Sequence, residues 1–133
     1  MRVPILALLG TVLAAAPAAA HHPFSSEFDT NALVRLTGKV TQVAWNGPHV
    51  IFHVTSGEGN GVQNWTLEAA SPGDLVRKGW SRDTLKIGEQ ITVDGFRARS
   101  EPMTAAARVI ELPGGKRMSA ADDQDGGPTF LPA

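Results

Sequence analysis

Apolar and polar residues alternate along most of the chain between positions 33 and 118, and this period of two is typical of half-buried β-strands. The first segment keeps the period from Val34 to Val40, after which the apolar positions move by one residue to Val43. A period that slips in this way indicates an extra residue within one strand. We therefore predict a strand with a bulge near Thr41.

Two further segments predict a hairpin that follows the turn NGPH. In VIFHV, the side chains of Val50, Phe52 and Val54 share one face of the strand. The Gly/Asn loop GEGNG comes next, and the following strand, VQNWTLEA, carries Trp65 and Leu67 on one side.

The pattern then changes to that of a short helix. Ser71 stands at a favourable N-cap position, Pro72 at the first helical position and Gly79 where a C-cap is expected. After a second turn in SRDTL, alternation returns through Ile91 and Val93, and AAARVIEL predicts a fifth strand. The turn PGG and the segment KRM add a short return strand.

This order of elements predicts an all-β protein with little α content. Three meandering strands, one short helix and two or three further strands follow the order of an OB-fold, a partly open barrel. We predict a five- to six-stranded OB-fold-like barrel over residues 33–118, with the helix between strands 3 and 4. Another small barrel or a sandwich is the alternative.

The first twenty residues have the features of a secretory signal peptide. Arg2 supplies positive charge, residues 5–16 are apolar, and alanines precede a cleavage site after Ala20. The apolar stretch is too short for a good membrane span, so we expect no membrane span after cleavage. Residues 1–20 thus predict a periplasmic or secreted protein that begins at His21.

Composition limits the classes of partner. Without residues 1–20 the chain keeps 113 of its 133 residues, and 11 Lys and Arg face 13 Asp and Glu, a formal net charge of −2. A weakly acidic exported domain lacks the basic footprint of nucleic-acid binding. The barrel is preceded by an N-terminal arm, residues 21–32, and the acidic, Gly/Pro-rich residues 119–133 predict a disordered C-terminal tail.

Four ordered motifs resemble a known family. They are HHPFSSEFD, LTGKVTQVAWNGPH, SPGDLVRKGWSRDTLKIGEQITVDGFRAR and ARVIELPGGKR, and together they cover about residues 21–117. They resemble exported bacterial proteins grouped as domain of unknown function 6152. The resemblance implies an exported OB-like β-barrel and supplies no activity. The family's NPH turn departs here, because Gly47 is inserted after the asparagine.

The histidines are the candidate metal ligands. An N-terminal histidine offers two nitrogens, its α-amine and ring Nδ1, and a second imidazole completes a T-shaped set of three that suits Cu(II). After cleavage His21 would be that residue, and the second imidazole could come from His22, His49 or His53.

His49 is the preferred partner of His21. His49 and His53 lie four residues apart on a strand, about 13 Å, which is too far to share one metal ion. His49 follows a turn at the edge of the barrel, where an N-terminal arm can fold back. Glu27 and Asp29 could orient a metal-ligating side chain without binding the metal themselves. The plain alternative is that these histidines are surface or turn residues without copper or zinc.

Other features predict no activity. The late basic residues could form an anion-binding patch, although such runs are more often solvated and balanced by acidic residues; they are Arg77, Lys78, Arg82, Lys86, Arg97, Arg99, Arg108, Lys116 and Arg117. The three tryptophans are better explained as core than as ligand platforms. Known nucleophile, zinc-protease and phosphate-loop motifs do not occur in the sequence, so we predict no enzyme.

Two functions therefore stand side by side. The first is a small periplasmic binding module that holds copper through His21 and His49, with His22 as a further candidate ligand. The second is a non-catalytic structural or protein-interaction module of the cell envelope that binds no metal. Its oligomeric state does not follow from the sequence.

Overall fold

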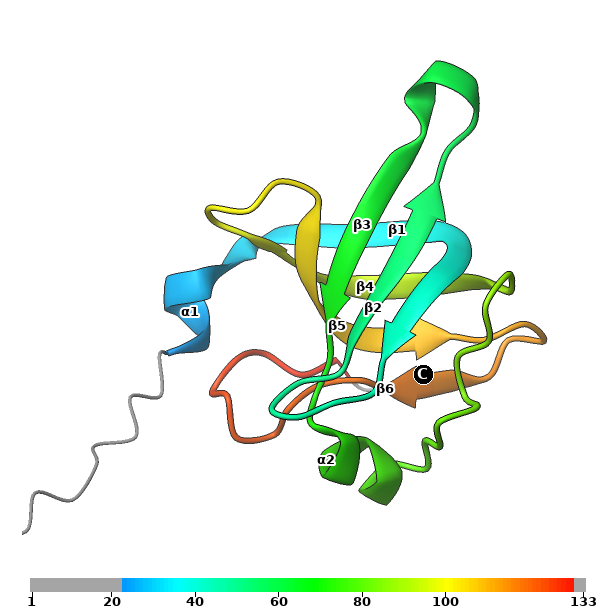
Figure 1. Ribbon diagram of the computed structural model, residues 1–133. Coiled ribbons are helices and arrows are strands. Elements are labelled where there is room, and N and C mark those ends of the chain that lie inside the picture. The colour runs from blue at the N-terminus through cyan, green and yellow to red at the C-terminus, as the bar shows by residue number, and fades with distance from the viewer. Residues whose placement is uncertain (1–22, 131–133) are drawn as a thin grey trace, which may run out of the picture.

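The computed structural model describes residues 23–130 as six β-strands and two short α-helices, with one 3₁₀ turn (Figure 1). The elements in chain order are α1 Phe24–Glu27, β1 Phe28–Ala44, β2 Ile51–Ser56, η1 Gly59–Gly61, β3 Gln63–Glu68, α2 Pro72–Arg77, β4 Gln90–Ala98, β5 Thr104–Glu111 and β6 Arg117–Ser119. The predicted all-β class and the helix between the third and fourth strands are confirmed.

The strands form one sheet that closes on itself. Their order is β3-β2-β1-β4-β5-β6, with antiparallel neighbours throughout. A short parallel pairing joins β3 to β5, where Glu68 lies opposite Ala106, and this pairing completes the ring. The arrangement is the one expected of an OB-like barrel, in which the sheet has few free edges.

The length and bend of β1 allow the ring to close. Its first part pairs with β4 and its last part with β2 (Figure 1). The β1–β2 register shifts between Val40 and Gln42, so the predicted bulge near Thr41 is confirmed. At Gly38 the backbone of β1 comes so close to the Thr55 carbonyl that a β-carbon would clash with it. A residue without a side chain is therefore needed there.

The barrel interior contains the apolar faces expected from the alternation. Val50, Phe52 and Val54 are fully buried, and Trp65 and Leu67 from β3 pack into the same core. A second, smaller cluster lies outside the ring and consists of Phe24, Phe28, Phe96 and Ala106, with Ala98 and Phe130 packed against it. This outer cluster attaches α1 to the barrel.

Local sequence signals place α2 as predicted. The Ser71 side chain accepts a hydrogen bond from the Asp74 amide, and Pro72 occupies the first turn. Gly79 has φ +93°, the left-handed conformation in which the chain leaves a helix. Leu75 is fully buried beneath the helix, whereas Val76 points outward and is 57% exposed.

Both ends of the described chain differ from the expected boundaries. The structure begins β1 at Phe28, so nine of the twelve residues of the expected arm, residues 21–32, belong to α1 and β1. At the other end, Ala120 and Ala121 are buried, although they fall in the expected disordered tail. The Ala120 amide donates to the Arg108 carbonyl, and its carbonyl accepts from the Ala70 amide. These partners are distant in sequence, and composition alone does not reveal them.

Candidate functional site

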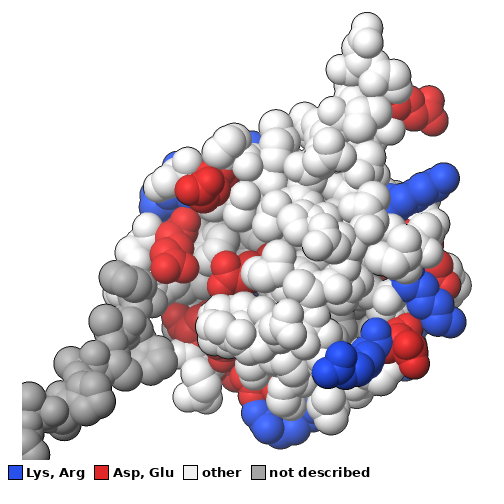
Figure 2. Space-filling view, in the orientation of Figure 1, with Lys and Arg blue, Asp and Glu red and all other residues white. Residues whose placement is uncertain are grey.

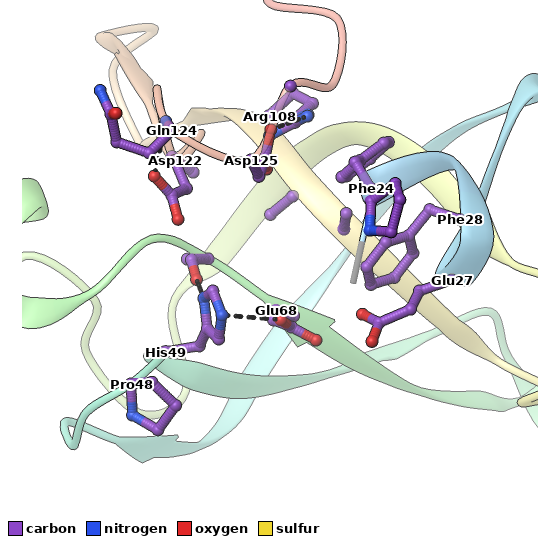
Figure 3. A pocket seen from close by; sticks show the side chains of 16 residues that line it. Phe24, Glu27, Phe28, Pro48, His49, Glu68, Arg108, Asp122, Gln124 and Asp125 are labelled. Carbon is purple, nitrogen blue, oxygen red and sulfur yellow. Dashed lines mark hydrogen bonds and ion pairs between the residues drawn. The ribbon is translucent and has the colours of Figure 1, made fainter. Parts of the chain in front are cut away.

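A cleft of about 860 Å³ lies outside the barrel ring, on the side that carries α1 (Figure 3). Its walls come from α1, the turn before β2, the end of β3, the middle of β5 and the chain after β6. Because residues alternate along a strand, Trp65 and Leu67 point inward and Glu68 points outward into this cleft. The cleft therefore lies on an outer sheet face that the two chain ends cover in part.

His49 enters the cleft from the turn before β2. The neighbouring backbone is fixed, because the Val50 amide donates to the Ala70 carbonyl and the Ala69 amide donates to the Val50 carbonyl. Nδ1 of His49 lies 3.1 Å from the Ala69 carbonyl oxygen. A carbonyl can only accept, so Nδ1 carries the proton and the lone pair of the neutral ring is on Nε2.

Nε2 of His49 lies 3.4 Å from a carboxylate oxygen of Glu68 (Figure 3). Burial raises the pKa of Glu68, and the negative charges of Glu27 and Asp125 raise it further, while His49 lowers it. An imidazole lone pair and a carboxylate that face each other repel unless a proton or another cation lies between them. This end of the cleft therefore favours positive charge.

The opposite wall carries an ion pair. Arg108, which is only 1% exposed, donates to both carboxylate oxygens of Asp125 at 2.7 and 3.0 Å. Asp122 lies nearby and also lines the cleft. With Glu27 and Glu68, the acidic groups of the cleft outnumber its one arginine. Figure 2 shows acidic side chains gathered on the side of the molecule near α1.

The predicted ligands are separated by the structure. His49 lines the cleft, whereas His53 points away from it and has its Nδ1 3.3 Å from the Thr66 hydroxyl. His21 and His22 lie outside the described residues. The first described residue, Pro23, lines the same cleft as His49.

The two acidic residues that were predicted to orient a metal ligand differ in their position relative to the cleft. Glu27 faces the cleft, while Asp29 does not line it and lies 3.9 Å from Arg99. Between residues 23 and 130, no group of three or more His, Asp or Glu side chains is arranged to hold a metal ion.

Five of the nine late basic residues form ion pairs with acidic side chains. Arg77 pairs with Asp74, for example, and Arg117 pairs with Asp94 and Glu111. This agrees with the balanced surface that was the main expectation. Trp65 and Trp80 are 3% exposed, as expected of core residues.

Glu68 was not predicted as a residue of the site, and Arg108 was grouped with the late basic residues rather than assigned to a buried ion pair. A signal for Arg108 existed, because it is the one charged residue inside the apolar run AAARVI. Such a position indicates a buried charge that needs a partner. Its partner Asp125 was assigned to the tail and could not be found by local pattern.

The sequence model of a family of unknown function, DUF6152, matches residues 10–107. The chain belongs to this family. The match to DUF6152 includes α1, His49 and Glu68 and ends one residue before Arg108. No curated protein matches the sequence. In the described part of this DUF6152 protein, every helix is too short to cross a membrane.

Proposed function

We propose that the mature protein is an exported, non-catalytic copper(II)-binding module of the cell envelope, with His21 and His49 as nitrogen ligands. The observation that carries the proposal is the state of His49. Its Nδ1 is held by the Ala69 carbonyl, which leaves Nε2 as a donor atom in an acidic cleft. A backbone carbonyl that orients a histidine in this way is typical of metal-ligating imidazoles.

The short separation in sequence between His21 and Pro23 supports the same site. Pro23 lines the cleft, and only one residue separates it from His21. An extended chain spans at most about 3.6 Å per residue, so two residues of chain reach at most about 7 Å. After cleavage behind Ala20, the amine and Nδ1 of His21 would join Nε2 of His49, a set of three nitrogens that suits Cu(II).

The surrounding charges favour a cation over an anion. Glu68 lies 3.4 Å from Nε2, and Glu27 raises the pKa of the Glu68 carboxyl through its own negative charge. A bound cation would relieve the repulsion among these groups. His22 would neighbour the site and is the second candidate for an additional nitrogen.

The decisive experiment is a Cu(II) titration of the mature protein, with its amino terminus confirmed by intact mass, followed by electron paramagnetic resonance. We expect tight 1:1 binding and a tetragonal, nitrogen-rich signal. One extra residue before His21 and the variant His49→Ala should each weaken binding at least tenfold. His53→Ala is the matched control, because His53 lies on the next strand and outside the cleft.

Weak Cu(II) binding that changes neither with the extra residue before His21 nor in the variant His49→Ala would contradict the proposal. The chain would then be better explained as a protein-interaction module of the envelope. In that case the search would move to partner capture with the same mature protein.

A further inference from the structure

The C-terminal segment, residues 122–130, lies against the outside of the barrel without joining the sheet. Within residues 23–130, the last backbone hydrogen bonds between this end of the chain and the barrel are those of Ala120. Beyond Ala120 the segment is held through side chains, which pair Lys78 with Asp123, Arg108 with Asp125 and Phe130 with Phe96. A segment without ladder hydrogen bonds can detach while the strands stay paired.

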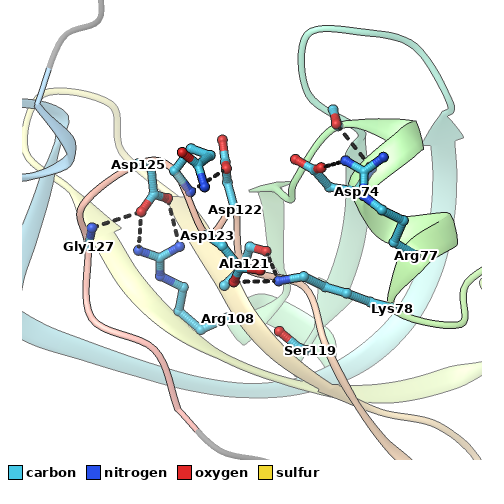
Figure 4. Close-up of polar contacts among 12 residues, drawn as sticks. Asp74, Arg77, Lys78, Arg108, Ser119, Ala121, Asp122, Asp123, Asp125 and Gly127 are labelled. Atoms are coloured by element: carbon cyan, nitrogen blue, oxygen red, sulfur yellow. Dashed lines mark hydrogen bonds and ion pairs between the residues drawn. The ribbon is translucent and has the colours of Figure 1, made fainter.

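The first anchor of the segment is a carboxylate. Both oxygens of Asp125 accept hydrogen bonds from the guanidinium of Arg108, at 2.7 and 3.0 Å (Figure 4). Arg108 is only 1% exposed, and its Nε has no hydrogen-bond partner among the described residues. A bidentate arginine contact selects a planar carboxylate in a fixed orientation. The surface under the segment therefore requires an acidic side chain at this point.

The second anchor is an aromatic ring. Phe130 packs on Phe96 of the outer cluster, with ring centres 5.3 Å apart. Between the two anchors, Gly127 passes so close to Arg108 and Phe24 that a β-carbon would collide with both. We call this surface of Arg108, Phe24 and Phe96 the segment groove. It fits the pattern Asp-x-Gly-x-x-Phe, which the chain carries at positions 125, 127 and 130.

A turn connects these anchors to the barrel. The Asp125 amide donates to the Asp122 carbonyl, and the Gln124 amide donates to the Asp122 side chain. Asp123 and Gln124 are exposed and polar, so opening of the turn exposes no apolar side chain of its own. Once open, its three residues span at most about 11 Å. The anchors can then reach the groove of a neighbouring molecule.

We propose that the segment groove is an interface between two copies of this chain, in which each copy places Asp125 and Phe130 in the groove of the other. A second copy is the occupant because it carries the sequence that the groove already fits. The exchange keeps the contacts of both anchors and opens only the turn, which makes it a low-cost route to a dimer. In the dimer, the Asp125 and Gly126 that line each cleft come from the other copy. This inference does not depend on copper.

The length of the turn tests the exchange. Deletion of Gln124 strains the closed turn but not the open one, so the mature deletion variant should dimerise at least tenfold more tightly than wild type. The matched control is insertion of one glycine after Gln124, which relaxes the closed turn and should favour the monomer. Sedimentation velocity over a series of protein concentrations measures both. A deletion variant that stays as monomeric as wild type would overturn the proposal.

A synthetic peptide of residues 121–130 distinguishes segment exchange from any other contact between copies. In excess it should fill the grooves and dissociate the dimer, whereas the peptide variant Asp125→Asn lacks the first anchor and should leave the dimer intact. A dimer that responds to neither peptide, or equally to both, would show that the copies meet elsewhere and would overturn the exchange.

A second protein variant keeps the test open if the deletion prevents folding. Phe130→Ala removes one anchor of the segment and leaves the buried ion pair in place. It should bind the fluorescently labelled peptide at least tenfold more tightly than the control Thr129→Ala, because Thr129 is an exposed residue of the same segment. Equal peptide affinity in the two variants would mean that the groove accepts no segment from outside, and the proposal would fail.

Discussion

A single pair of side chains, His49 and Glu68, sets the chemistry of the cleft. The Ala69 carbonyl fixes which ring nitrogen of His49 carries the proton, and Nε2 then faces a half-buried carboxyl. Burial and two neighbouring carboxylates raise the pKa of that carboxyl. Glu68 therefore holds a proton to higher pH in the folded protein than in the unfolded chain.

This pKa shift predicts a pH-dependent loss of stability. From the reference value of 4.5 up to the raised pKa of Glu68, the folded state binds more protons than the unfolded state. The free energy of unfolding therefore falls as pH rises through that window. Glu68→Gln removes this contribution, so we expect its stability relative to wild type to increase with pH. Urea unfolding at a series of pH values above 4 measures the difference.

The matched control for this prediction is Glu58→Gln. Glu58 is exposed in the loop between β2 and β3 and lies outside the cleft. It reports the effect of removing one surface carboxylate. If Glu68→Gln and wild type keep a constant difference across the pH series, burial of Glu68 does not penalise its charged form.

At the scale of single residues, the sequence distinguishes His49 from His53 but does not single out Glu68, and a metal at His49 stays a prediction. His49 could be chosen over His53 because it follows a turn, and the structure places His49 in the cleft and His53 outside it. Glu68 could not be chosen, because its importance comes from α1 and the C-terminal segment covering the end of β3. That coverage depends on contacts between residues far apart in the chain.

Among the elements, β1 is the strand that links the two halves of the barrel. It pairs with β4 and then with β2, and its bulge near Thr41 shifts the register within the β1–β2 pairing. Gly38 takes part in both pairings, opposite Ser56 of β2 and opposite Ile91 of β4. Its backbone is also in close contact with the Thr55 carbonyl. Three strands are therefore packed around a position that has no side chain.

A methyl group at this position should strain the sheet. Gly38→Ala would place its β-carbon against the Thr55 carbonyl, and the strands must separate to admit it. We expect a loss of about 1–3 kcal/mol in the free energy of unfolding, which is typical of overpacking. Gly47→Ala is the control, since a β-carbon there meets nothing within 4 Å. Equal urea midpoints for the two variants would contradict this account of β1.

Elements with signals in their own residues were predicted well. The bulge in β1, the Ser71 cap and the inward faces of β2 and β3 all follow from short stretches of sequence. Helix α1 was not predicted, because its four residues contain one turn only. Its position depends on Phe24 packing against Phe28 and Phe96, and Phe96 is distant in the chain.

In the whole molecule, the two ends of the described chain meet on one side of the barrel. Phe24 and Asp125 both contact Arg108, and Phe130 packs on Phe96 beside them. The acidic composition of residues 119–133 suggested a disordered tail, but some of those charges have specific partners. Asp123 pairs with Lys78 and Asp125 with Arg108, so the segment covers one wall of the cleft.

Removal of this segment should therefore destabilise the whole barrel. Truncation after Ala121 keeps the buried alanines but removes the carboxylate that pairs with Arg108. Breaking a buried pair from one side costs about 3 kcal/mol. Truncation after Gly127 keeps Asp125 and removes only the contact of Phe130, so it should cost less than half as much. Urea unfolding of both truncated proteins decides between a segment that stabilises the fold, which predicts unequal losses, and a passive tail, which predicts none.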